Sequence, residues 1–268
     1  MARVITVTSG KGGVGKTTTT ANLGTALAIQ GARVVVIDAD IGLRNLDVVM
    51  GLENRIVYDL VDVVEGRARL RQSLIKDKRV PELYLLPAAQ TRDKDAVSSD
   101  DMIDLTNQLR QEYDFVLIDC PAGIETGFKN AIAGADEILI VTTPEVSAVR
   151  DADRVVGLVE AAEKGPPRLI INRLNPRLVA KGEMLSMDEV VEILALEPIG
   201  VVPEDEHIVS STNRGEAAVF NQSSQAGRAF HNIARRLNGE HVPLLEPTEQ
   251  NGVFDRLFGG LFGRRART

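Results

Sequence analysis

The chain has 268 residues, of which 44% are hydrophobic and 26% charged, and its formal net charge is -7. This length allows one large α/β domain or two small ones, and the acidic balance argues against a protein whose whole surface binds nucleic acid. The single cysteine, Cys120, excludes an internal disulfide and a Cys-x-x-Cys metal site, and no apolar run approaches the roughly 20 residues that cross a bilayer, so we expect a cytoplasmic protein.

Short apolar runs alternate with helical stretches along most of the chain. Strands are predicted at 4–8, 33–37, 83–86, 115–119, 137–143, 168–171 and 199–202. Helices are predicted at 16–30, 100–112, 146–164, 187–194 and 225–238. Most of the strands are apolar without alternation, as in strands buried on both faces of a parallel sheet. The order predicts an α/β fold with a doubly wound, mostly parallel sheet and helices on both faces.

Three regions of different composition follow one another. Residues 1–238 form one domain, because the alternation of strands and helices runs through them without a break. Residues 239–252 contain prolines, glycines and acids and predict a flexible linker. Residues 253–268 form a short C-terminal tail with its own pattern.

A phosphate-binding loop follows the first predicted strand. Residues 10–17, Gly-Lys-Gly-Gly-Val-Gly-Lys-Thr, match G-x-x-x-x-G-K-[ST], with a strand before them and a helix after them. Glycines let backbone N–H groups converge on phosphate oxygens, and the helix N-terminus adds partial positive charge. Lys16 is expected at the β- and γ-phosphates, and the Thr17 hydroxyl on Mg²⁺. The predicted ATP-binding residues here are Gly10, Lys11, Gly12, Gly13, Val14, Gly15, Lys16, Thr17 and Thr18.

Carboxylates end two of the predicted strands. Asp38 and Asp40 lie two residues apart, so both side chains are expected on one face, at the sheet edge that holds the phosphate loop. They would hold Mg²⁺ through water and orient an attacking water; the alternative is a turn or helix cap. Asp119 follows four apolar residues, which is the Walker B layout for a magnesium ligand. Its neighbour Cys120 is expected to be a buried small residue.

Two later positions suit a nucleotide base. Asn172 ends a strand, and its amide offers a donor and an acceptor to an adenine edge; the alternative is a turn residue. No Asn-Lys-x-Asp signature for guanine follows, so we expect ATP and not GTP.

The C-terminal tail has an amphipathic pattern. Its apolar residues recur at i, i+3, i+4, i+7 and i+8, with arginines after them. Three glycines, each costing roughly 1 kcal/mol in a helix, would keep it from folding alone in water. We expect a helix that forms on an anionic membrane surface, with packing on the domain or in a protein groove as alternatives. The predicted membrane contacts are Phe254, Leu257, Phe258, Leu261, Phe262, Arg264 and Arg265.

The second lysine of the phosphate loop carries a family resemblance. Lys11 before Gly12-Gly13-Val14-Gly15-Lys16-Thr17 resembles the deviant Walker A box of the ParA/MinD family, P-loop NTPases of the SIMIBI type. The resemblance implies that Lys11 acts in trans across an ATP-sandwich homodimer; a solvated loop lysine is the alternative. It implies catalytic roles for Lys11, Lys16 and Asp40. Of these, Asp40 would position the hydrolytic water.

Three further assignments follow from the resemblance. Residues 40–47 and 119–125 resemble the two switch segments, with Cys120 where the family usually has serine. The loop containing Pro203 would close over the base. Asp151 lies near the start of the interface helix; an acid of the first helical turn that complements the helix dipole is the alternative.

The Phe-rich basic tail makes the chain similar to the MinD branch of the family. The similarity implies a slow, partner-stimulated, Mg²⁺-dependent ATPase that attaches reversibly to the inner face of the cell membrane. It also implies a MinC-like inhibitor of the septum (FtsZ ring) and a MinE-like or other topological factor as partners, and no nucleic acid. A MinD-like regulator of flagellar number and a ParA-type DNA-segregation ATPase are the alternatives.

Overall fold

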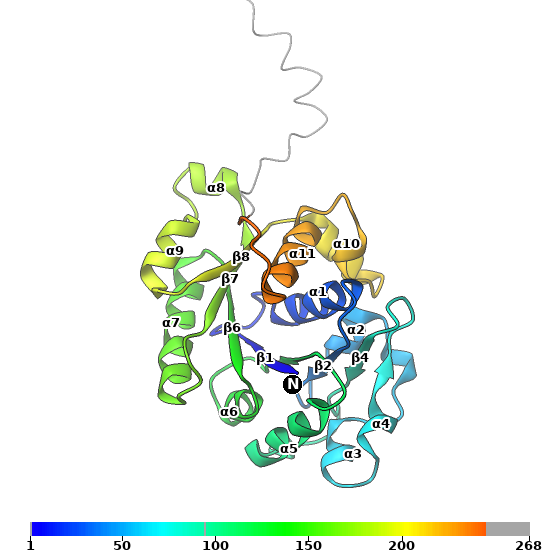
Figure 1. The fold of residues 1–268 in the computed structure, drawn as a ribbon. Helices are drawn as coiled ribbons and strands as arrows, with labels where there is room; N and C mark the ends of the chain where they lie inside the picture. Colours follow the sequence, from blue (N-terminus) through cyan, green and yellow to red (C-terminus); the bar gives the residue numbers. More distant parts are fainter. Residues whose placement is uncertain (1, 94, 245–268) are drawn as a thin grey trace, which may run out of the picture.

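The computed structural model describes residues 2–93 and 95–244, which build an eight-stranded sheet with helices on both faces (Figure 1). The order across the sheet is β3-β4-β2-β5-β1-β6-β7-β8, and every neighbouring pair is parallel except β3 with β4. The strands are β1 (Arg3–Thr8), β2 (Val34–Asp38), β3 (Ile75–Lys76), β4 (Leu83–Leu86), β5 (Phe115–Asp119), β6 (Glu137–Thr142), β7 (Arg168–Leu174) and β8 (Pro198–Pro203). The predicted fold class is confirmed.

The helices include several that the sequence did not predict. They are α1 (Lys16–Ile29), α2 (Leu46–Met50), α3 (Leu60–Val64), α4 (Leu70–Ser73), α5 (Ser99–Leu109), α6 (Thr126–Ala133), α7 (Val146–Ala161), α8 (Pro176–Ala180), α9 (Met187–Leu194), α10 (Glu206–Asn213) and α11 (Gln225–Leu237), with 3-10 turns η1 (Glu53–Arg55) and η2 (Ala218–Phe220). Of the unpredicted ones, α2, α3, α4 and α8 have four or five residues and are too short to show helical periodicity, whereas α6 and α10 have eight residues, as the predicted α9 does.

One apolar cluster lies on each face of the sheet. On β2, Val35 and Ile37 join the cluster under α3, α5, α6, α7 and α9, whereas Val34 and Val36 join the one under α1, α2 and α11. Burial on both faces explains the uninterrupted apolar runs of the strands. Gly24 lets α1 approach the sheet, because a Cβ there would lie 2.5 Å from Cγ1 of Val36.

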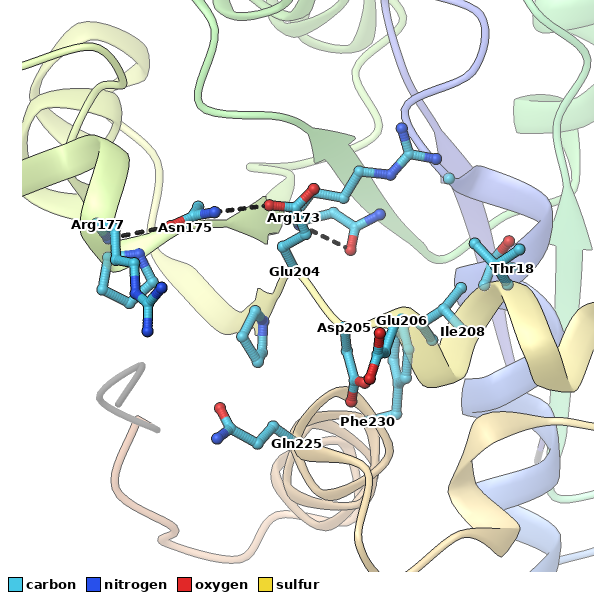
Figure 2. Close-up of a pocket in the computed structure, with 15 residues that line it drawn as sticks. Thr18, Arg173, Asn175, Arg177, Glu204, Asp205, Glu206, Ile208, Gln225 and Phe230 are labelled. Atoms are coloured by element: carbon cyan, nitrogen blue, oxygen red, sulfur yellow. Dashed lines mark hydrogen bonds between the residues drawn. The ribbon is translucent and has the colours of Figure 1, made fainter. Parts of the chain in front are cut away.

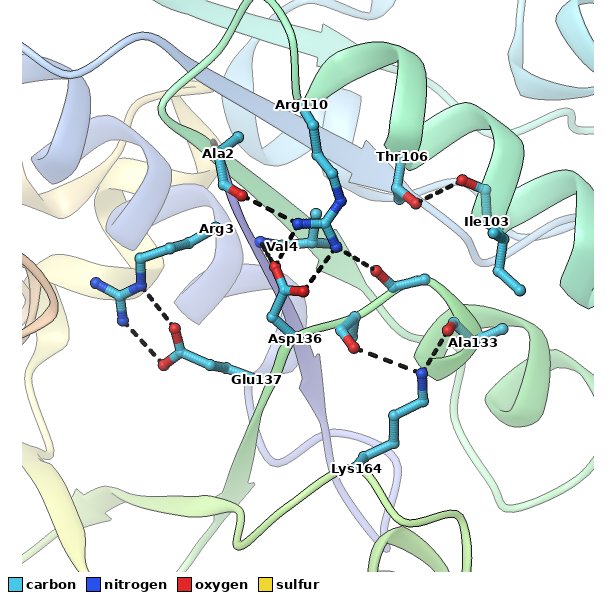
Figure 3. A network of polar contacts seen from close by, with 12 residues as sticks. Ala2, Arg3, Val4, Ile103, Thr106, Arg110, Ala133, Asp136, Glu137 and Lys164 are labelled. Carbon is cyan, nitrogen blue, oxygen red and sulfur yellow. Dashed lines mark hydrogen bonds and ion pairs between the residues drawn. The ribbon is translucent and has the colours of Figure 1, made fainter.

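The amino ends of the strands are held together by ion pairs (Figure 3). Arg3 on β1 makes two hydrogen bonds, of 2.6 and 2.9 Å, to the carboxylate of Glu137 on β6. Arg110 after α5 bonds both oxygens of Asp136, at 2.6 and 2.7 Å. This network holds the amino ends of the strands together, at the end of the sheet opposite the phosphate loop.

The chain turns back after α11. The guanidinium of Arg236 donates to the carbonyl of Ile199 on β8 at 2.7 Å, to that of Val242 at 2.8 Å, and to that of Pro243. The first residues of the predicted linker are therefore bonded to the domain. Residues 245–252 of that linker, and every predicted membrane contact from Phe254 to Arg265, lie outside the described residues.

Candidate functional site

The phosphate loop joins β1 to α1 in a conformation that needs glycine. Gly13 and Gly15 have φ values of 79° and 102°, in the left-handed region. Gly10 packs against α7, where a Cβ would lie 2.0 Å from the carbonyl oxygen of Asp151. Gly15 precedes α1 without a side-chain cap among the described residues, so the first N–H groups of this helix point toward the loop.

The two lysines of the loop lie in different environments. Lys16 is 7% exposed, and its Nζ donates to Oγ of Ser9 at 3.0 Å. The side chain of Lys11 is 44% exposed and reaches the start of α7, where its Nζ lies 3.2 Å from Oγ of Ser147 and 3.8 Å from the carboxylate of Glu145. Lys16 therefore faces inward, and Lys11 lies at the surface.

Asp38 and Asp119 are neighbours at the carboxyl ends of β2 and β5. They are register partners, and they are 1% and 2% exposed. Burial raises the pKa of Asp38 to about 6, and burial together with the charge of Asp38 raises the pKa of Asp119 to about 8. Two adjacent buried carboxylates favour a cation, which would relieve both the burial and the mutual repulsion.

Asp38 is also a cap, as the alternative interpretation had it. Its Oδ1 accepts from the backbone N–H of Asp40 at 2.9 Å, and its Oδ2 from those of Asn45 and Leu46 at 3.0 Å each. The strand ends at Asp38, so the expectation that Asp40 shares a strand face with it is wrong. Asp40 is half-buried, beside a small groove lined by Pro121 and other residues of the second predicted switch.

These donors fit Mg²⁺. Asp119 accepts a hydrogen bond of 3.4 Å from Thr20, and a hydrogen bond from Thr17 offsets part of the rise in its pKa that burial and Asp38 cause. Hydroxyl and carboxylate oxygens therefore meet at the loop. The oxygens of Asp38 already accept backbone hydrogen bonds, so it would hold the ion through water. No group of three or more His, Cys, Asp or Glu suited to a metal occurs in the described part of the chain.

A cavity of about 630 Å³ opens beside the loop (Figure 2). Gly15 and Thr18 line one side, and Asn172 and Pro203 lie at the ends of β7 and β8. Asn172 is 7% exposed; its Nδ2 donates to the carbonyl of Val14 at 2.8 Å, and its Oδ1 accepts from the N–H of Arg173. Asn172 therefore braces the loop and has one amide proton left for a ligand.

Several lining residues were missed by the sequence analysis. They lie at the end of β7, on the turn to α8 and in α8, and on the β8–α10 loop and in α10, and they are Arg173, Asn175, Arg177, Asp205, Glu206, Ile208 and Val209. One signal was available: Asn175 before Pro176 is typical of a helix start, and Oδ1 of Asn175 caps α8 by accepting from the N–H of Arg177 at 3.0 Å. Asp151 lies in the second turn of α7, so a first-turn role is wrong, because the helix begins at Val146.

The site geometry agrees with the comparisons to known proteins. The model of the CobQ/CobB/MinD/ParA nucleotide binding domain matches residues 5–219. The septum site-determining protein MinD of Bacillus subtilis is 54% identical over 268 residues, which cover 99% of this chain and 100% of that protein. The chain belongs to the MinD family of septum site-determining proteins. It carries the nucleotide-binding domain of the MinD/ParA ATPases and acts in determining the site of cell division.

Solved structures of the MinD family have the same fold. MinD in a MinC:MinD cell division protein complex from Aquifex aeolicus has a TM-score of 0.86 and 49% identity, with 91% of this chain and 99% of that chain covered. MinD of Pyrococcus horikoshii complexed with Mg-ADP has a TM-score of 0.80 and 30% identity, with 89% and 96% covered. Within residues 2–93 and 95–244, no helix combines the length and the apolar character needed to cross a bilayer.

Proposed function

We propose that this MinD-family protein binds Mg·ATP between the phosphate loop and the cavity and hydrolyses it slowly. Backbone N–H groups of residues 10–18 and the Lys16 ammonium would hold the phosphates, with the base in the cavity beside Asn172 and Pro203. Thr17 and Asp119 would hold Mg²⁺ directly or through water, and Asp38 through water. The cation supplies charge neutralisation at the phosphates when it is bound.

Asp40 is the proposed positioning group for the attacking water. It lies two residues after the buried Asp38, at the groove between the predicted switch segments. A half-buried carboxylate can hold a water and accept its proton as the water oxygen bonds to the γ-phosphorus and the bond from that phosphorus to the β,γ-bridging oxygen breaks, which releases ADP and phosphate. Hydrolysis stays slow because the exposed Lys11 would add its charge only in a dimer, and because a partner of MinE type would complete the site.

The ATP state is proposed to be a homodimer that attaches to membrane. Lys11 is exposed next to α7, from where it can reach a second copy of the chain. The predicted tail at 253–268 would bind anionic lipid weakly, and two tails on a dimer would bind with an avidity gain of about 100-fold. On the membrane the dimer would recruit a MinC-like septum inhibitor, as the MinC:MinD complex from Aquifex aeolicus supports.

The observation that carries this proposal is the convergence of Lys16, Asp38 and Asp119 at one sheet edge, all at most 7% exposed. Burying one cation and two carboxylates is costly unless they serve a ligand or pair with one another. A Gly-rich loop, a helix N-terminus and a cavity lie beside them, which is the arrangement that a Mg-nucleotide requires.

The test is co-sedimentation with vesicles of anionic phospholipid. We expect the full chain to pellet with ATP and to stay in the supernatant with ADP. Phe258→Glu and a chain ending at Gly252 should stay in the supernatant with both nucleotides. Lys11→Ala should bind ATP and yet fail to pellet. Pelleting that survives loss of the tail, or no pelleting of the full chain with ATP, would contradict the membrane proposal and make ATP-dependent DNA binding the next measurement.

A further inference from the structure

One buried carboxylate of the cavity has no role in the proposed chemistry. Asp205 lies between β8 and α10, and its side chain is 0% exposed. A carboxylate that is removed from water this completely must be hydrogen-bonded, or it would be protonated or destabilising. The hydrogen-bond partners of Asp205 therefore indicate its role.

Both oxygens of Asp205 accept two hydrogen bonds. Oδ2 accepts from Oγ of Ser224 at 2.7 Å and from the backbone N–H of Ala226 at 3.1 Å. Oδ1 accepts from the backbone N–H of His207 at 2.9 Å and lies 2.7 Å from Nδ1 of the same residue. Burial acts to raise the pKa of Asp205, but these bonds outweigh it and lower the pKa, so the group is ionised at neutral pH.

These bonds join the two elements that face each other across the cavity. The β8–α10 loop and α10 contribute Glu204, Glu206 and Ile208 to the lining, and α11 contributes Gln225 and Phe230 (Figure 2). Ser224, which donates to Asp205, also caps α11 by accepting from the N–H of Gly227 at 2.9 Å. One carboxylate thus holds the start of α10 against the start of α11.

We propose that Asp205 is a positioning residue that sets the shape of the cavity wall and, through it, the affinity for the nucleoside part of the nucleotide. This proposal rests on the nucleotide binding proposed above and not on the dimer or membrane steps. Among the described residues, the hydrogen-bond partners of the Asp205 side chain are His207, Ser224 and Ala226, and none of them belongs to the phosphate loop. Phosphate binding and nucleoside binding are therefore separable.

Asp205→Asn is the informative substitution because it preserves shape and removes one acceptor. In either orientation the NH₂ group of the amide faces a backbone N–H, that of Ala226 or that of His207. A backbone N–H can only donate, so it finds no acceptor there. A buried donor then loses its partner. With NH₂ toward Ala226 the bond between the loop and the start of α11 is lost, and with NH₂ toward His207 the bond that orders the start of α10 is lost, so either orientation alters the cavity wall.

Asp77→Asn is a matched control. Asp77 is also a buried carboxylate, 6% exposed, that accepts from the backbone N–H groups of Arg79 and Val80 at 2.7 and 2.9 Å. It lies between β3 and β4 and does not line the cavity. The two variants share one chemical change, from a buried carboxylate to an amide, so a difference in ligand binding between them reports on the cavity. Both donors to Asp77 reach Oδ1, which an amide can keep as an acceptor, so the thermal stability of each variant is measured beside its ligand binding.

The experiment is calorimetric titration of the full chain with Mg·ADP and with Mg·tripolyphosphate. We expect Asp205→Asn to weaken Mg·ADP binding by about 10- to 100-fold and tripolyphosphate binding by less than about twofold. Asp77→Asn should leave both unchanged. In steady state, Asp205→Asn should raise KM for ATP by a similar factor and leave kcat within about twofold.

Three results would overturn the inference: unchanged Mg·ADP affinity in Asp205→Asn, an equal loss for both ligands, or an equal loss in Asp77→Asn. If the parent chain binds neither ligand, the proposed function itself has failed. If Asp205→Asn does not fold, Ser224→Ala is the substitute, because it removes one donor to Oδ2 of Asp205. The inference then requires a loss of Mg·ADP affinity of about three- to tenfold with no loss of tripolyphosphate affinity.

Discussion

The phosphate loop and the base cavity lie side by side but are built in different ways. The loop is one contiguous stretch, residues 10–18, whose proposed phosphate-binding groups are backbone N–H groups and a buried lysine. The cavity of about 630 Å³ is lined by residues from the loop, from β7, from β8 and from α10 and α11, more than 200 positions apart at the extremes. Contacts such as that of Asn172 with Val14 bring these parts together.

We expect the phosphate loop and the cavity to differ in how well they tolerate substitutions. Phosphate recognition depends on backbone geometry, so it demands glycine at fixed positions and a lysine in a buried place. The cavity depends on packing and on a few buried polar bonds, so single changes at its rim should be mild. Four predictions, from the largest effect to the smallest, test this contrast.

Lys16→Ala should reduce ATP affinity by about 30-fold or more. It removes the buried ammonium that would pair with phosphate oxygens, and truncating one partner of a buried charge pair costs about 2–5 kcal/mol. Calorimetric titration with Mg·ATP measures it, with the exposed Lys78→Ala as the control. Equal ATP affinities in the two variants would show that Lys16 does not contribute to nucleotide binding.

Gly15→Ala should lower ATP affinity by about tenfold or more and destabilise the fold. A Cβ at Gly15 would lie 2.3 Å from Nδ2 of Asn172, and its φ of 102° disfavours alanine. Gly31→Ala is the matched control, since its φ is 95° and a Cβ would meet nothing within 4 Å. We expect Gly31→Ala to lose about 1 kcal/mol of unfolding free energy and no affinity.

In Mg²⁺-free buffer, the free energy of unfolding should fall as the pH rises from about 4 toward 8. The native chain keeps a proton on Asp119, whose pKa is raised to about 8, whereas the unfolded chain has released it above about pH 4. Urea unfolding with EDTA at several pH values measures the slope. Asp38, whose pKa is raised to about 6, adds to the slope below about pH 6, so Asp119→Asn should flatten the slope chiefly between about pH 6 and 8. An unchanged slope in that range would show that Asp119 is not the group responsible.

Glu204→Gln should change ATP affinity by less than about threefold. Glu204 lines the cavity rim, and its Oε2 accepts a 2.8 Å hydrogen bond from Nδ2 of Asn175 in an exposed position, where such bonds contribute little. Comparing its loss of ATP affinity with that of Gly15→Ala shows how differently the cavity rim and the phosphate loop respond to substitution. A loss as large as that of Gly15→Ala would contradict the distinction between them.

The sequence predicted those features that depend on neighbours in the chain. The seven apolar runs became strands, and the Gly-rich motif and Asp119 came to one sheet edge as expected. It did not predict α2 or α10, whose stability depends on packing against other parts of the fold. It also missed Asp205, whose partners Ser224 and Ala226 lie 19 and 21 positions away and show no pattern in the chain.

The role of Asn172 illustrates the same limit. Its position at a strand end was predicted, but its bond to Val14 spans 158 positions and becomes visible only once the sheet is formed. The amphipathic tail lies outside the described residues and stays a prediction from periodicity and charge.

The two edges of the sheet decide how copies of this protein can associate. β3 has two residues, and β8 has Pro198 and Pro203 at its ends, with the carbonyl of Ile199 already bonded to Arg236. β3 is too short to pair with a further strand over any length, and the prolines of β8 cannot donate to one, so among the described residues neither edge strand is well suited to strand addition. Molecules crowded together at high local density are thereby kept from joining edge to edge into continuous β-sheet aggregates.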